Sequence, residues 1–196
     1  MTLANHRPAL TMEEWQDFSH AGTLYSLAHL HAYTQIFQRP PLPEKPGQTY
    51  TVHISFSHHC FTKGLPSDEE ERYDYSLRYD HQGDKRIFDT RRWQLSKQLP
   101  KLISEMHGRK CLQTGKGNFL SISVIDENGA EVQYEIYFRV WKPGRGRIKL
   151  HIESAYVRDP IATNESGIGS SRPKSARPIA FFTILHNTLN EIPIRS

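Results

Sequence analysis

The pattern of apolar and polar residues divides the chain into an N-terminal helical part and a later part built mainly of strands. Thr11 followed by Glu14 forms a capping box, in which each side chain satisfies a backbone donor of the other residue. Apolar residues at helical spacing follow, and the Pro-rich segment 40–43 ends the run because proline removes backbone donors. The pattern therefore predicts a helical element over residues 11–37, with a bend near Gly22.

Alternation of apolar and polar residues predicts strands in most of the remaining chain. Residues 50–59 alternate in this way, and residues 73–79 repeat the pattern over a shorter stretch. Between residues 118 and 159 three alternating stretches are separated by two turn segments, 126–129 and 142–146, both of which contain glycine. These stretches predict a β-meander.

One amphipathic helix is predicted between these two strand regions. Its apolar residues recur at i, i+4, i+7, i+8 and i+11, and they are Leu95, Leu99, Leu102, Ile103 and Met106. Pro100 lies in the first turn of this helix if Ser96 caps it, and otherwise marks a kink. A last apolar stretch, 179–189, fits either a helix or a buried strand.

Together these elements predict an α+β fold. It comprises N-terminal helices, a mostly antiparallel sheet with a β-meander in the C-terminal half, and one packed amphipathic helix. Residues 1–196 are expected to form a single domain, because this length can bury one core without disulfides. Within it, 11–37 is the helical element, 48–159 contains the sheet and its helix, and 160–178 is a flexible loop rich in Ser, Gly and Pro.

Composition narrows the class of protein. The chain has 25 Lys and Arg against 21 Asp and Glu, which gives a net charge of +4 and suits an acidic partner. Its two cysteines do not form a disulfide scaffold and favour a reducing compartment. Because no apolar run approaches the roughly 20 residues of a membrane span and residues 1–10 lack a signal-peptide layout, we expect a cytoplasmic protein without a membrane partner.

The outward face of the meander is the first candidate site. Alternation places Tyr137, Arg139 and Trp141 on one strand, and Arg147, Lys149, His151 and Glu153 on the next, with Arg145 in the turn between them. Cations can contact phosphates and aromatic rings can stack on bases, so this face is predicted to bind nucleic acid. His151 and Glu153 would add acid–base catalysis. The alternative is the ordinary solvated face of an antiparallel sheet.

The histidines of the first strand form a second candidate. On an extended strand His53 and His59 share one face, and either could act as a general acid or base. With Cys60 nearby, the segment invites a zinc interpretation, but it contains neither a CxxC nor an HExxH spacing. We therefore predict packed, hydrogen-bonded histidines and no metal or other cofactor.

Two further groups of residues lie at element ends. Tyr156 could stack or donate a proton, and Arg158 could hold a phosphate, at the end of the last meander strand; alternatively Tyr156 anchors the core and Arg158 pairs with Asp159. The basic residues around the central helix suit either an external anion or the acidic run 68–71, and they are Lys85, Arg86, Arg91 and Arg92.

The meander ends in the basic strand 147–158, Arg-Ile-Lys-Leu-His-Ile-Glu-Ser-Ala-Tyr-Val-Arg. Helices followed by a meander with such a strand resemble the barnase–EndoU–colicin–RelE group of metal-independent ribonucleases and toxins, over residues 50–159. The resemblance implies RNA cleavage by Arg, His, Glu or Tyr side chains on the sheet.

The leading hypothesis is therefore a bacterial or phage protein that acts on RNA, a ribonuclease-like toxin in its most specific form. The alternative is a non-enzymatic protein that uses the same face to bind nucleic acid or an acidic protein. A third possibility is a structural interaction module. The sequence does not give the strand order, so it leaves open whether His53 and His151 converge. Only if they do can the two act jointly as acid and base, because general catalysis needs both groups within reach of one reacting centre.

Overall fold

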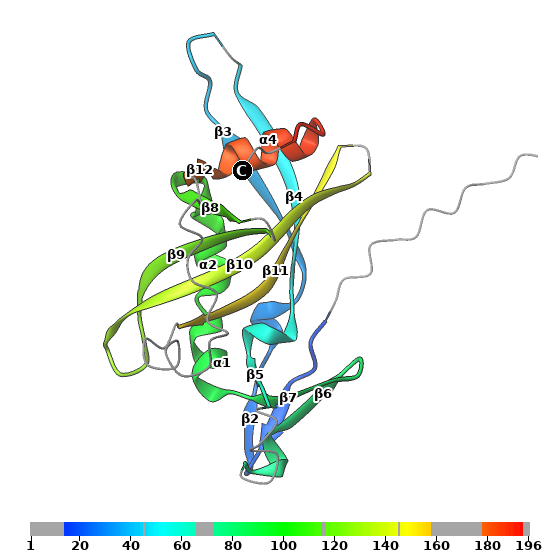
Figure 1. Ribbon diagram of the computed structural model, residues 1–196, viewed down its shortest axis with the longest axis vertical. Coiled ribbons are helices and arrows are strands. Elements are labelled where there is room, and N and C mark those ends of the chain that lie inside the picture. Colours follow the sequence, from blue (N-terminus) through cyan, green and yellow to red (C-terminus); the bar gives the residue numbers. More distant parts are fainter. Residues whose placement is uncertain are drawn as a thin grey trace, which may run out of the picture.

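A seven-stranded sheet forms the frame of the molecule in the computed structural model, which describes residues 14–44, 46–65, 73–114, 117–144, 146–157 and 178–193 (Figure 1). Its strands are β3 (Tyr33–Arg39), β4 (Gln48–Phe56), β8 (Lys110–Thr114), β9 (Gly117–Ile125), β10 (Glu131–Gly144), β11 (Arg147–Val157) and β12 (Pro178–Ala180). Their order is β12-β8-β9-β10-β11-β4-β3. The pair β11–β4 is parallel and the other pairs of this sheet are antiparallel. The predicted meander β9–β10–β11 is confirmed.

A smaller region of short strands lies at the end of the molecule away from the tip of the β3–β4 hairpin (Figure 1). It contains the hairpin β1 (Phe18–His20)–β2 (Thr23–Tyr25) and a three-stranded sheet of β5 (Thr62–Gly64), β6 (Arg78–His81) and β7 (Asp84–Phe88). The 3-10 turns η1 (Ala28–Leu30), η2 (His58–Cys60) and η3 (Tyr75–Leu77) connect these strands to their neighbours. Aromatic side chains fill the space between them, including a stacked pair, Phe18 and Phe88, whose ring centroids are 4.3 Å apart.

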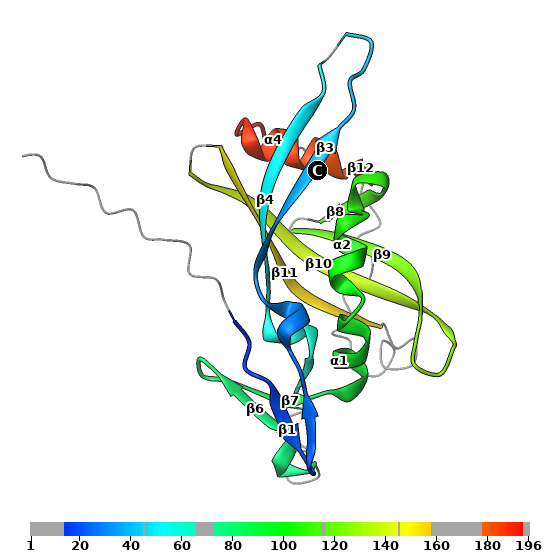
Figure 2. The same ribbon diagram turned by 180° about the vertical axis from the view of Figure 1, so that it is seen from behind.

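The apolar face of the central helix is buried as predicted, but its residues are divided between two helices, α1 (Thr90–Ser96) and α2 (Leu99–Ser104), and Met106 lies in the turn after them. Figure 2 shows them in front of β10 and β11, and α2 is followed by the 3-10 turn η4 (Met106–Gly108). Pro100 lies in the first turn of α2, where no intrahelical donor is lost. Ser96 does not cap that helix, because its hydroxyl donates to the carbonyl oxygen of Trp93.

The final apolar stretch contains both of the predicted alternatives. Pro178–Ala180 forms β12, and α4 (Phe181–Leu189) begins at the next residue and packs against β10, β11 and β12. The buried residues of β4, β10 and β11 form one cluster with those of α1, α2 and α4. None of the helices that the structure describes is long and apolar enough to cross a membrane.

The α+β prediction with N-terminal helices is wrong, because the molecule is mostly β and its first described α-helix begins at Thr90. Residues 14–37 form β1, β2, η1 and most of β3, and Gly22, with φ at +75°, closes the β1–β2 turn. Of the apolar side chains at helical spacing, Trp15 and Phe18 pack against aromatic rings, Leu27 and Leu30 are buried in the core, and Leu24 is exposed. Tertiary packing thus overrides local propensity. Thr11, the expected cap, and residues 160–177 of the expected loop lie outside the described residues.

Two of the predicted strands also have different bounds in the structure. Residues 73–79 were expected to form a strand, but β6 begins only at Arg78, after η3. The strand expected over 50–59 ends at Phe56, since the hydroxyl of Ser57 accepts from the backbone N–H of His59 and starts η2. A side-chain bond of this kind offers the backbone an alternative to the sheet.

His29 gives the fold a predicted sensitivity to acid. Its Nε2 lies 2.8 Å from the hydroxyl of Ser96, which itself donates to Trp93, so the neutral ring donates the hydrogen. Burial lowers the pKa of His29 to about 4, with further lowering by Lys97 and His31. Below pH 6.5 the His29 side chain is protonated in the unfolded chain, whereas in the folded chain it stays neutral until about pH 4. Because the ring is partly exposed and solvent screens its charge, stability should therefore fall by only about 1–2 kcal/mol over this pH range.

Urea unfolding at pH 7 and pH 4.5 checks this expectation. His29→Gln, which retains a donor for Ser96, should lose less stability between the two pH values than the natural protein loses. His107→Gln serves as the control, because His107 is exposed on η4. Equal losses in the natural protein and His29→Gln would contradict the assignment.

Candidate functional site

The face of the sheet opposite the core carries most of the predicted site residues. The register of β10, β11 and β4 aligns them in two rows across three strands, Arg139–His151–Ser55 and Trp141–Lys149–His53. Strands are spaced by about 4.8 Å and residues by about 3.3 Å, so the Cα atoms of His53 and His151 are about 8 Å apart on one face. The register therefore places the two histidines on one face of neighbouring strands, two residues apart along the strand direction. We call the six residues of these rows the outer face.

Contacts on the outer face determine which cations can meet a ligand. Glu153 occupies an irregularity in the β10–β11 pairing, and its carboxylate forms an ion pair with the guanidinium of Arg139. The ammonium group of Lys149 lies 5.4 Å from the centre of the Trp141 ring, which is 40% exposed. Arg147 is exposed at the beginning of β11. Lys149 and Arg147 are thus better placed for phosphates than Arg139.

His151 is held in place from the neighbouring strand. Its Nδ1 lies 2.8 Å from the hydroxyl of Ser55, a buried residue of β4. A hydrogen bond at one ring nitrogen fixes the orientation of an imidazole. His151 also lines a cleft, so this ring is both positioned and accessible.

The cleft has a volume of about 670 Å³ and lies between residues 14–17, the end of β4 and the β6–β7 turn. Three histidines line it together with aromatic and acidic side chains: His58, His81, His151, Trp15, Tyr79, Glu14, Asp17 and Asp80. The Trp15 ring centre is 4.9 Å from that of His81, and the His58 and His81 centres are 5.0 Å apart. Concave sites with aromatic walls and a few titratable groups are the usual places for ligands.

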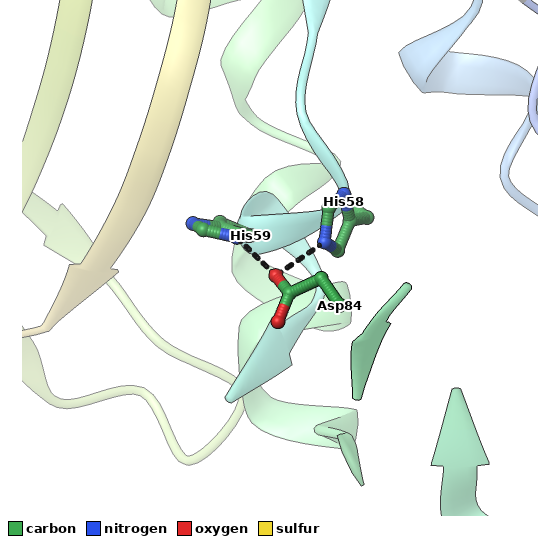
Figure 3. Close-up of side chains that lie close together, drawn as sticks. All are labelled: His58, His59 and Asp84. Atoms are coloured by element: carbon green, nitrogen blue, oxygen red, sulfur yellow. Dashed lines mark hydrogen bonds and ion pairs between the residues drawn. The ribbon is translucent and has the colours of Figure 1, made fainter. Parts of the chain in front are cut away.

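Next to this cleft, His58 and His59 converge on one carboxylate (Figure 3). The Nε2 atoms of both rings lie 3.0 Å from Oδ2 of Asp84. Burial lowers the pKa of His58, and the hydrogen bonds from the two rings lower the pKa of Asp84. The guanidinium of Arg86 lies 3.6 Å from the same oxygen. At neutral pH the cluster thus combines an ionised carboxylate with a neutral His58 ring.

The turn that carries these histidines is tied to β11 and α1. The backbone N–H of Ser57 donates to Ile152, and the hydroxyl of Thr62 donates to the carbonyl oxygen of His58. The guanidinium of Arg92 on α1 donates to the carbonyl oxygens of His59 and Thr62. These bonds hold η2 at the end of the sheet.

Tyr156 and His59 do not join His53 and His151. Tyr156 stacks on Tyr137 with ring centres 5.6 Å apart, and Arg92 covers the Tyr156 ring at 5.0 Å. His59 was expected on the strand face of His53, but it lies on η2 beyond the end of β4. Arg145 and Arg158 lie outside the described residues.

Sequence reasoning missed three residues of the cleft region, Trp15, His81 and Asp84. One signal could have found two of them. Gln82 and Gly83, both with positive φ, form a two-residue turn that pairs His81 with Asp84. Recognising a hairpin there would have placed an imidazole and a carboxylate side by side.

Comparison with known proteins gives a family match over most of the chain. The model of the YjaZ family matches residues 17–189. No curated protein and no solved structure matches the chain.

Proposed function

This chain belongs to the YjaZ family, and we propose that it acts on RNA as a metal-independent ribonuclease. RNA would lie across the outer face, with His53 and His151 as the acid–base pair. The observation that carries the proposal is the placement of these two histidines on one face, next to Lys149 and an exposed Trp141.

The reaction needs one base, one acid and one cation. One imidazole removes the proton of a ribose 2′-hydroxyl, whose oxygen attacks the adjacent phosphorus. The other imidazole protonates the departing 5′-oxygen, so that a 2′,3′-cyclic phosphate and a 5′-hydroxyl end form. Lys149, beside His53 in the register, would stabilise the negative charge that develops on the phosphoryl oxygens.

Binding is assigned to Trp141 and Lys149 of the outer face and to Arg147, two residues before Lys149 on β11. Trp141 offers a ring on which a base can stack, and Arg147 and Lys149 offer cations for the phosphates. Arg139 contributes less, because Glu153 already offsets its charge. Such a surface binds single-stranded RNA with little sequence preference.

Incubating the pure protein with labelled single-stranded RNA in EDTA tests the proposal. We expect cleavage with 2′,3′-cyclic phosphate ends and none of a substrate that carries 2′-deoxyribose throughout. Binding without cleavage would contradict the enzymatic proposal and favour a nucleic-acid-binding or regulatory protein. If the protein neither binds nor cleaves RNA, the third hypothesis, a structural interaction module, is favoured.

Lys149→Gln gives a separate test of the binding surface. Loss of one phosphate contact should weaken RNA binding similarly for different sequences and reduce the salt slope of log K by about 1. Lys101→Gln is the matched control, because Lys101 is an exposed lysine of α2. Fluorescence anisotropy at several salt concentrations measures the RNA affinity and its salt dependence. If the two variants have equal salt slopes, Lys149 does not contact the RNA.

A further inference from the structure

We propose that His58, His59 and Asp84 bind one divalent transition-metal ion, for which the donor set favours Zn²⁺. Two imidazole nitrogens and a carboxylate oxygen are donors that Zn²⁺ uses in proteins. The proposal goes beyond the acid–base reaction on the outer face, which requires no metal.

The distances between the donor atoms suit such an ion. Each Nε2 is 3.0 Å from Oδ2 of Asp84, and the three atoms lie within 4.8 Å of one another. Around a tetrahedral Zn²⁺ with bonds of about 2.0–2.1 Å, neighbouring donors are about 3.3 Å apart. The two Nε2–Oδ2 distances would therefore lengthen by only a few tenths of an ångström on coordination, and the two Nε2 atoms, already within 4.8 Å of each other, would settle at a similar spacing.

The backbone around the donors is already in place. The bonds of Ser57, Thr62 and Arg92 hold η2, and the β6–β7 pairing places Asp84 at the end of a two-residue turn. The side chains of His58 and His59 are 12% and 35% exposed. An ion could therefore enter from solvent without rearrangement of the fold.

Three protein donors leave one tetrahedral position for water or a small anion. Because His58 also lines the cleft, this position would border it. Cys60 does not supply a fourth ligand, since it is buried and its Sγ lies 3.9 Å from the carbonyl oxygen of Ile152. Among the described residues, this is the group whose donor atoms could hold a metal ion.

Arg86 opposes the ion and thereby provides a specific test. Its guanidinium lies 3.6 Å from Oδ2 of Asp84, so its charge lowers the affinity for a cation. Arg86→Gln should bind Zn²⁺ more tightly, by several-fold. A cluster with a purely structural role gives no reason for such a gain.

Isothermal titration with Zn²⁺ and the visible absorption of bound Co²⁺ measure the site in the full chain. We expect one ion per chain, and affinity at least about tenfold lower in His58→Ala, His59→Ala and Asp84→Asn. The matched control is His20→Ala, which removes a histidine 3.6 Å from Asp74, a pair to which the part of the chain that the structure describes adds no third metal donor. Circular dichroism establishes that each variant is folded.

Two results would overturn the proposal: no uptake of one ion by the natural protein, or uptake that the His59 and Asp84 substitutions leave unchanged. Unchanged affinity in Arg86→Gln would remove the assignment of the ion to Asp84. RNA cleavage is measured in EDTA, so a failure of the metal site and a failure of the ribonuclease proposal are separate results.

Discussion

Replacing His151 with alanine should lower the rate of RNA cleavage by about 10²–10⁴-fold, the range that a positioned acid or base contributes. Affinity for RNA should change little, because phosphate and base contacts are assigned to Lys149, Arg147 and Trp141. A loss in kcat with an unchanged KM is the expected signature. Single-turnover cleavage and anisotropy, measured on the same preparation, separate the two quantities.

His107→Ala is the matched control, since His107 is an exposed histidine on η4. Ser55→Ala tests positioning, because it removes the hydroxyl that contacts Nδ1 of His151. It should lower kcat less than His151→Ala does, and Ser55→Thr should restore part of the rate. Undiminished cleavage by His151→Ala would exclude His151 from the reaction.

Arg92→Met should destabilise the fold by about 2–3 kcal/mol. The guanidinium donates to the carbonyl oxygens of His59 and Thr62 and covers the ring of Tyr156. Methionine fills much of the space but cannot donate, so partly buried carbonyl groups lose a charged partner. Chemical unfolding measures the loss in free energy.

Arg91→Met is the neighbouring control on the same helix. The Arg91 side chain is 52% exposed and forms an ion pair of 3.5 Å with Asp126, and such exposed contacts contribute about 0–1 kcal/mol. Asp126 keeps its bonds from the backbone N–H groups of Asn128 and Ala130. If both substitutions cost the same, Arg92 would not be the link between α1 and η2.

The two arginines show what a charge pattern alone cannot decide. The sequence left open whether the basic residues near the central helix meet an external anion or an internal partner. In the structure Arg86 and Arg91 contact carboxylates, and Arg92 contacts backbone carbonyls. Arg91 and Arg92 are adjacent in sequence but have different energetic roles. Arg91 is exposed to solvent, whereas Arg92 lies in the packed contact between α1 and η2.

The sequence predicted correctly those elements that depend on side-chain periodicity alone. The meander was found because alternating residues between glycine turns satisfy the strand period over three successive strands. The N-terminal part was misread because Leu24, Leu27 and Leu30 share a helical spacing, while Tyr33 and Phe37 on β3 are fixed by pairing with β4. That pairing joins segments that a local pattern does not connect.

By itself, the sequence determined the meander, the buried face of the central helices, and the basic and aromatic character of the outer face. These follow from side-chain periodicity, which is a local property. Only the tertiary structure decided that β4 lies parallel beside β11, which places His53 near His151, and that Asp84 meets His58 and His59. Strand order depends on how distant segments bury their apolar faces together, and a one-dimensional pattern does not contain that choice.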